Sequence, residues 1–199
     1  MNETRDANRR IIARELQIRD LGKLRKLIVE NLRVEDHKVP VYLIHFIFDL
    51  PLRSLGLGTI FCSIAQTYDE KIVGAIIARR FPLAKVWVIG PVVVDKRYRG
   101  FGIGNSIMEL TLKSLQDKKA EGALISVDNT RRHSAARSFF RKFGFRYSKH
   151  IFTSSKQAYG YARMVTLRKS LYSRTRENSS QETDPEISQK TWYLMVKEF

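Results

Sequence analysis

The chain's most distinctive stretch is Val92-Val93-Val94-Asp95-Lys96-Arg97-Tyr98-Arg99-Gly100-Phe101-Gly102-Ile103-Gly104. Its β-branched residues predict a strand, and the three glycines at alternate positions predict a tight basic turn that opens a helix. In such a turn the backbone N–H groups converge, and the helix dipole adds positive charge at the same point. The stretch therefore predicts a site for an anionic group such as a phosphate.

Two other phosphate-binding patterns fit this stretch less well. A P-loop needs a lysine and a hydroxyl residue after its last glycine, and nothing after Gly100 supplies them. A dinucleotide-binding fingerprint needs three glycines spaced G-x-G-x-x-G, of which Gly100 and Gly102 supply two, although Asp128 could serve as its acid. The region that follows also lacks the helix–strand alternation of a doubly wound sheet. Dinucleotide binding is therefore the weaker interpretation.

Two motifs occur in order along the middle of the chain. Arg99 to Gly104 reads Arg-x-x-Gly-x-Gly at a helix start, and residues 136–145 form an alanine-bearing helix that ends in an aromatic residue, a basic residue and Gly-Phe. Together they resemble the pyrophosphate signature and a following helix of the GNAT acetyltransferase superfamily. The resemblance implies an α/β fold of the α+β type, with a mixed, mostly antiparallel sheet flanked by helices on both faces.

The resemblance also implies acetyl-CoA as co-substrate and assigns its contacts. The pantetheine arm would pair with the backbone of the 92–94 strand, because Gly90-Pro91 predicts a bulge that frees strand N–H and C=O groups. The implied coenzyme contacts are Val92, Val93, Val94, Arg99, Gly100, Phe101, Gly102, Ile103, Gly104, Asn105, Asn129 and His133. No metal site is expected.

Acetyl transfer to an amine needs a base for the amine, a donor for the thioester oxygen and a proton for the departing thiolate. Counted back from Gly144-Phe145, the family's glutamate base aligns with Asp128, or with Ser126 if there is an insertion. The family's tyrosine acid aligns with Phe140, which cannot donate a proton, so His133 or water would supply it. We therefore expect an N-acetyltransferase that acts on a primary amine of a small molecule, a protein N-terminus or a lysine. The alternative is a coenzyme-binding or nucleic-acid-associated module that has lost catalysis.

Positive charge is concentrated in one part of the sequence. The chain has 36 Lys and Arg against 20 Asp and Glu, and residues 129–176 contain thirteen Lys and Arg but no acid. Arginines in this block could steer coenzyme A by its phosphates; they are Arg131, Arg132, Arg137 and Arg141. The surplus predicts either a solvated basic surface or an acceptor bound to nucleic acid or the ribosome.

Length and composition predict one enzyme domain with a tail. The expected organisation is a domain over residues 1–172, a polar linker over 173–190 and an apolar segment over 191–199 that docks as a strand. A single cysteine, Cys62, the absence of a secretory signal and the absence of a membrane-length apolar stretch favour the cytoplasm, with no membrane partner. Exchange of residues 191–199 between subunits would give a homodimer.

Periodicity predicts the remaining elements. A strand is expected at 15–19, then a helix with Asp20 as its N-cap and Leu24, Leu27, Ile28 and Leu32 on one face. A second helix is expected at 39–50. Further strands are expected at 59–68, 72–81, 86–94 and 123–127, with a hairpin of 146–153 and 161–168. The helix after the glycine turn should bury Ile103, Ile107, Met108, Leu110, Leu112 and Leu115.

Overall fold

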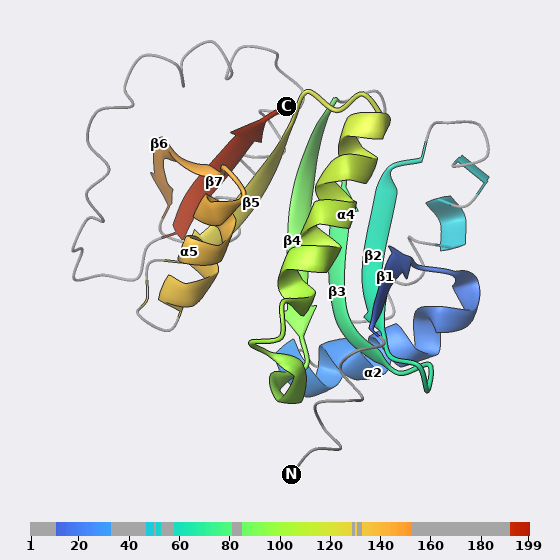
Figure 1. Cartoon of the computed structure of the whole chain (residues 1–199). Coiled ribbons are helices and arrows are strands. Elements are labelled where there is room, and N and C mark those ends of the chain that lie inside the picture. Colours follow the sequence, from blue (N-terminus) through green and yellow to red (C-terminus); the bar gives the residue numbers. More distant parts are fainter. Residues whose placement is uncertain are drawn as a thin grey trace. The chain divides into compact units, whose positions relative to one another are not determined.

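A computed structural model describes residues 11–32, 47–49, 51–52, 58–80, 85–128, 130, 133–152 and 192–199 (Figure 1). The chain divides into two compact units, one made of residues 1–82 and 89–119 and the other of residues 83–88 and 120–199. The expected 173–190 linker, the 161–168 strand and most of the 39–50 helix lie outside the described residues. Within the described residues, no helix has both the length and the apolar content needed to cross a membrane.

The described residues include seven strands and three longer α-helices, together with helical residues at 47–49 and 51–52. The strands are β1 (Ile12–Glu15), β2 (Ile60–Gln66), β3 (Ile72–Arg79), β4 (Val86–Val94), β5 (Gly122–Asp128), β6 (Arg146–Phe152) and β7 (Trp192–Glu198). The helices are α2 (Leu21–Leu32), α4 (Ile103–Asp117) and α5 (Ser134–Lys142), with short 3-10 helices η2 (Ile18–Asp20) and η4 (Lys96–Tyr98). The prediction of a mostly antiparallel sheet combined with helices is confirmed.

The first unit carries strands in the order β1-β2-β3-β4 with a helix on each face. The β1–β2 and β2–β3 pairs are antiparallel, and Cys62 and Ile64 of β2 lie opposite Ile77 and Ala75 of β3. These side chains share a buried cluster with the apolar face of α2. The alternate residues of the same strands face α4, since successive strand side chains point to opposite faces. The sheet is therefore covered on both sides in this unit.

Helix α4 buries the face that its sequence predicts, with one exchange. Five of the six predicted residues are buried, but Leu110 is only half-buried, and Thr111 is fully buried instead. Thr111 lies four residues from both Ile107 and Leu115, at the centre of the buried stripe, whereas Leu110 lies at its margin. The Thr111 hydroxyl is satisfied at that position because it donates to the Ile107 carbonyl, 2.7 Å away, and lies 2.5 Å from the Ser63 hydroxyl.

The expected strand at 15–19 is corrected by the structure. Strand β1 covers Ile12–Glu15, and the chain then turns into η2. Both Nη atoms of Arg14 donate to the Asp20 carboxylate, at 2.7 and 2.9 Å, and the Gln17 N–H donates to the same group at 2.8 Å. Asp20 is therefore a buried ion-pair partner that folds the chain back on β1 and does not cap α2. The Arg14 guanidinium lowers the pKa of Asp20.

The second unit places β7 between β5 and β6. The order is β5-β7-β6, both pairings are antiparallel, and the first residues of β4 precede β5 in the strand order. Leu124 lies opposite Val196, and Tyr147 lies opposite Met195. Among the described residues the partner of β6 is therefore β7, and the hairpin partner expected at 161–168 lies outside them.

Candidate functional site

The end of β4 leads into the predicted phosphate-binding turn, and its three valines differ in burial. Val93 is 3% exposed and belongs to the core cluster of the first unit, whereas Val92 and Val94 are half-buried. This alternation anchors the strand end through one side chain. Val92 and Val94, on either side of it, are less buried. A strand whose backbone pairs with a ligand needs such partly exposed residues.

The glycine turn has the backbone that an anion site needs. Gly100 and Gly102 have φ angles of +85° and +79°, a region that residues with a Cβ rarely adopt. Helix α4 starts directly after Gly102, whose carbonyl accepts the first helical hydrogen bond from the Ser106 N–H at 3.1 Å. The N–H groups of Ile103, Gly104 and Asn105 therefore have no acceptor within the helix. They present three donors at the positive end of the helix dipole.

Arg99, the arginine of the motif, braces the turn against the strand. Its Nε atom donates to the Val94 carbonyl at 3.0 Å, while the side chain is exposed. The residue is extended, with φ of −74° and ψ of 151°. A guanidinium held in this way at the edge of the glycine turn is suited to charge-assisted contact with a phosphate.

The base of the same loop is built around Asp95. This residue is 3% exposed, and its carboxylate accepts hydrogen bonds from the Arg97 N–H at 3.0 Å, Arg97 Nε at 3.2 Å and Arg97 Nη2 at 2.8 Å. Lys71 Nζ lies 3.5 Å from the same carboxylate. The Arg97 side chain is the main cause that lowers the pKa of Asp95, from 3.8 to about 2. Arg97 is thus a partner of Asp95 in this structure.

Asp95 makes the stability of the first unit depend on pH. Its folded-state pKa lies below the unfolded value, so its stabilising contribution is present above about pH 4 and is lost as pH falls toward 2. The shift corresponds to about 2 kcal/mol. We expect the difference in unfolding free energy between the wild type and Asp95→Asn to shrink by about two thirds of that amount from pH 6 to pH 2.5, because Asp95 is still partly ionised at pH 2.5. Urea titrations at both pH values measure it, and an unchanged difference would contradict the ion pair.

The other predicted site residues belong to the second unit. Asp128 is the last residue of β5 and lies opposite Trp192 in the register, and its alternative, Ser126, is half-buried on the same strand. Asn129 lies outside the described residues. His133 precedes α5, where its N–H donates to the Thr130 carbonyl at 2.9 Å and its Nδ1 lies 3.1 Å from the Thr130 hydroxyl. The structure thus brings the glycine loop and the valine strand together in the first unit. In the second unit, contacts with Thr130 hold His133 in place.

Comparisons with known proteins agree with this geometry. The model of the family described as an acetyltransferase (GNAT) domain matches residues 59–147, which span β2 to the start of β6. Residues 59–147 are therefore identified as a GNAT acetyltransferase domain. The predictions of this superfamily and of an acyltransferase are therefore confirmed. A search of curated proteins found no match.

Solved GNAT structures share the fold at low sequence identity. A protein from Desulfovibrio desulfuricans described as a GNAT-family acetyltransferase has a TM-score of 0.66 and 10% identity, over 94% of this chain and 98% of that one. PaiA N-acetyltransferase from Thermoplasma acidophilum, solved with coenzyme A, has a TM-score of 0.59 and 16% identity, over 95% and 99%. The ribosomal-protein-S18-alanine N-acetyltransferase from Escherichia coli has a TM-score of 0.59 and 12% identity, over 94% and 93%.

The GNAT domain has a phenylalanine where the superfamily pattern has its tyrosine. Phe140 lies on the inner face of α5 and is 5% exposed. Its ring lies 5.2 Å from that of Phe139 and 6.0 Å from that of Phe145, both in edge-to-face geometry. The residue therefore packs this helix onto its own unit and supplies no proton.

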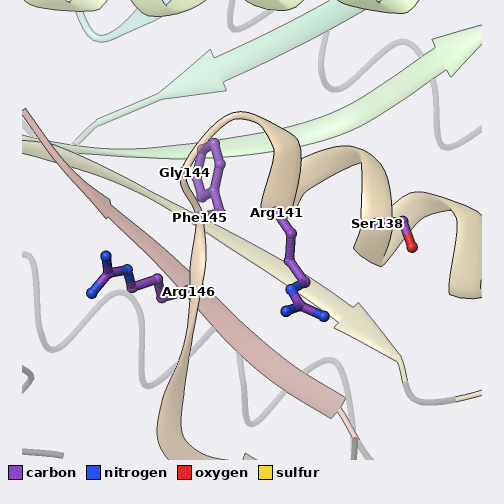
Figure 2. A pocket seen from close by; sticks show the side chains of 5 residues that line it. All are labelled: Ser138, Arg141, Gly144, Phe145 and Arg146. Atoms are coloured by element: carbon purple, nitrogen blue, oxygen red, sulfur yellow. The ribbon is translucent and has the colours of Figure 1, made fainter. Parts of the chain in front are cut away.

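A surface hollow of the GNAT domain lies at the other end of α5 from His133. It has a volume of about 490 Å³ and is lined by Ser138, Arg141, Gly144, Phe145 and Arg146 (Figure 2). Figure 2 shows the guanidinium groups of Arg141 and Arg146 on different sides of the turn that joins α5 to β6. Arg141 is one of the arginines predicted to steer coenzyme A, but no lining residue belongs to the glycine turn or the valine strand, so we assign no acetyl-transfer role to this hollow.

Two residues that pack beside the glycine turn were not predicted from the sequence. Asp95 stands within the quoted stretch, and an aspartate directly before a short turn is a cap signal that could have found it. Gly74 is buried on β3 under the first turn of α4, where an added Cβ would lie 3.1 Å from Ile103 Cγ2 and 3.3 Å from Ile107 Cδ1. A glycine inside an apolar strand signals close approach of another element.

Proposed function

We propose that this protein transfers an acetyl group from acetyl-CoA to a primary amine. The observation that carries the proposal is the turn at Gly100 and Gly102, whose two left-handed glycines present the first N–H groups of α4 directly after a half-buried strand end. The match of residues 59–147 to the GNAT domain supports acetyl-CoA as the anion-bearing co-substrate. A neighbour of the same fold was solved with coenzyme A.

Most of the proposed site residues bind the coenzyme, and a strand N–H takes part in the acetyl-transfer step. The N–H groups of Ile103, Gly104 and Asn105 hold the pyrophosphate, and Arg99 adds a charged contact. The backbone of Val92 to Val94 pairs with the pantetheine arm, and an N–H near Val94 donates to the thioester oxygen as it becomes anionic. The remaining proposed coenzyme contacts are Gly100, Phe101, Gly102, Asn129 and His133.

Proton transfer is the less demanding part of the reaction. We assign Asp128 as the base that takes a proton from the attacking amine, with Ser126 as the alternative position. An α-amine with a pKa of about 8 is already partly neutral near pH 7, so a weak base suffices for it. The departing coenzyme thiol, if its pKa resembles that of cysteine at about 8.5, leaves as thiolate with water or His133 as the proton source.

The acceptor is a small-molecule amine, a protein N-terminus or a lysine. Of the solved neighbours, one is described as acting on an alanine of ribosomal protein S18, which supports a protein N-terminus. The basic residues of α5 and β6 support a further proposal, that the acceptor is bound to nucleic acid or to the ribosome. The single cysteine also fits a cytoplasmic protein. Residues 1–172 then form the catalytic domain, 173–190 a linker and 191–199 a docked strand, which could also be exchanged in a homodimer.

The first experiment compares melting temperatures of the chain alone, with acetyl-CoA and with NADH. A ligand at a hundredfold its dissociation constant stabilises the fold by about 2.7 kcal/mol, which raises the midpoint by several degrees for a chain of this size. We expect a rise with acetyl-CoA and none with NADH. A rise with NADH alone, or with neither ligand, would contradict the proposal.

Turnover is then tested by adding pools of amines and measuring thiol release from acetyl-CoA. The expected result is release that depends on the added amine. If acetyl-CoA raises the melting temperature but no amine pool releases thiol, the protein is instead a coenzyme-binding module that has lost catalysis.

A further inference from the structure

The strongest unassigned cluster of the molecule lies at the base of the glycine loop. Asp95 is almost fully buried, and its carboxylate forms ion pairs with two cationic side chains, Arg97 and Lys71. Lys71 comes from the turn between β2 and β3, far from Asp95 in sequence but in the same unit. A carboxylate withdrawn from water in this way needs its partners, so the cluster fixes the relative positions of the segments that supply them.

Hydrogen bonds donated by backbone N–H groups connect the cluster to β3 and to α2. The Asp95 N–H donates to the Val73 carbonyl of β3 at 2.8 Å, and the Asp95 carbonyl accepts from the Tyr98 N–H at 2.9 Å. The Lys96 N–H donates to the side-chain oxygen of Asn31, near the end of α2, at 3.3 Å. Lys71 Nζ also lies 5.2 Å from the centre of the Tyr98 ring. The segment just before Arg99 is therefore tied to β3, to the β2–β3 turn and to α2.

We propose that Asp95 is a positioning residue for the coenzyme, because it holds the loop so that the glycine turn is ordered before the ligand arrives. This inference rests on the proposed acetyl-CoA site. Arg99 and Gly100 follow Asp95 by four and five residues, and both are exposed. Without the cluster, the loop would have to become ordered when the pyrophosphate binds, and that loss of entropy would weaken binding. Asp95 touches no reacting atom in this scheme.

The test compares Asp95→Asn with a matched control, Asp20→Asn. Asp20 is also a buried carboxylate of the first unit that accepts two hydrogen bonds from one arginine, Arg14, but its contacts lie at the start of the fold. Both variants lose a buried ion pair, so both should lower the melting temperature. Asparagine keeps the size of the side chain and one acceptor oxygen, which favours folding of both variants.

Two measurements distinguish a role of Asp95 in positioning the loop from a general loss of fold stability. Calorimetric titration with coenzyme A, well below both melting temperatures, should give a dissociation constant about tenfold weaker for Asp95→Asn and unchanged for Asp20→Asn. In steady-state kinetics, Asp95→Asn should raise the KM for acetyl-CoA with little change in kcat at saturation, because bound coenzyme restores the loop.

The outcomes distinguish this inference from the proposed function. If the wild type binds coenzyme A and both variants bind it equally well, Asp95 has only a structural role and the inference is wrong. The same conclusion follows if Asp20→Asn weakens binding as much as Asp95→Asn. If the wild type itself does not bind, the acetyl-CoA site is wrong, and the inference is overturned with it.

Discussion

Replacement of Gly102 by valine is expected to abolish acetyl-CoA binding. The φ angle of +79° at this position costs an L-residue about 1–2 kcal/mol, and a β-branched side chain adds to the strain. Apart from the two chain neighbours, no described atom lies within 4 Å of the position that a Cβ would take, so the space is open and we expect the new side chain to block the approach of the phosphates. We expect at least a 100-fold loss of affinity, about 2.7 kcal/mol, in a calorimetric titration with coenzyme A.

Gly144→Val is the matched control for this experiment. Gly144 has a similar φ angle, +81°, and its added Cβ would meet only the end of the flexible Lys197 side chain, at 3.0 Å. It should show a comparable drop in melting temperature with unchanged coenzyme affinity. Tight binding by Gly102→Val would remove the glycine turn as the phosphate site, and loss of binding in both variants would point to strain alone.

Replacement of Gly74 is expected to lower both stability and coenzyme affinity. The first turn of α4 packs so closely on β3 that a Cβ at residue 74 would lie 3.1 Å from Ile103 Cγ2. Adding bulk to a packed core costs about 1–3 kcal/mol. Gly74→Val would also move the start of α4, and with it the N–H groups that bind the phosphates. Urea unfolding measures the first effect, and titration with coenzyme A measures the second.

A double-mutant cycle shows whether the contact with Ile103 is responsible. Gly74→Ala and Ile103→Ala each destabilise the protein, the first by crowding and the second by leaving a cavity. In the double variant the new methyl group occupies part of the space that Ile103 vacates. The combined loss of unfolding free energy should therefore be smaller than the sum of the two single losses. If the two losses of unfolding free energy are additive, the contact between residue 74 and Ile103 does not determine the distance of α4 from the sheet.

The parts of the fold that periodicity and glycine placement determine could be predicted from the sequence. β4 starts and ends at the predicted residues, and α4 begins directly after the glycine turn. Both depend on local rules, namely β-branched residues in a strand and left-handed glycines before a helix. Helix α2 also buries Leu24, Leu27 and Ile28 as its spacing predicts.

The strand that was placed wrongly from the sequence depends on a side-chain contact that periodicity does not reveal. The segment at 15–19 alternates like a strand, but pairing between Arg14 and Asp20 turns the chain after Glu15. In the site, the glycine turn could be found from its own residues. The supports of that turn could not, because Lys71, Val73 and Asn31 reach Asp95 and Lys96 only in the folded chain.

The position of β7 governs how the second unit can form during synthesis. β5 and β6 lie near each other in the chain, yet β7 lies between them and ends at residue 198. While a ribosome is still translating residues 153–191, β5 and β6 have been synthesised but β7, with which both of them pair, has not. Their unpaired edges can then pair with other chains. The described strands and helices of the first unit are all synthesised by residue 119, so its pairing meets no such delay. A nascent chain therefore completes its glycine turn well before the strand that carries Asp128 can pair with β7.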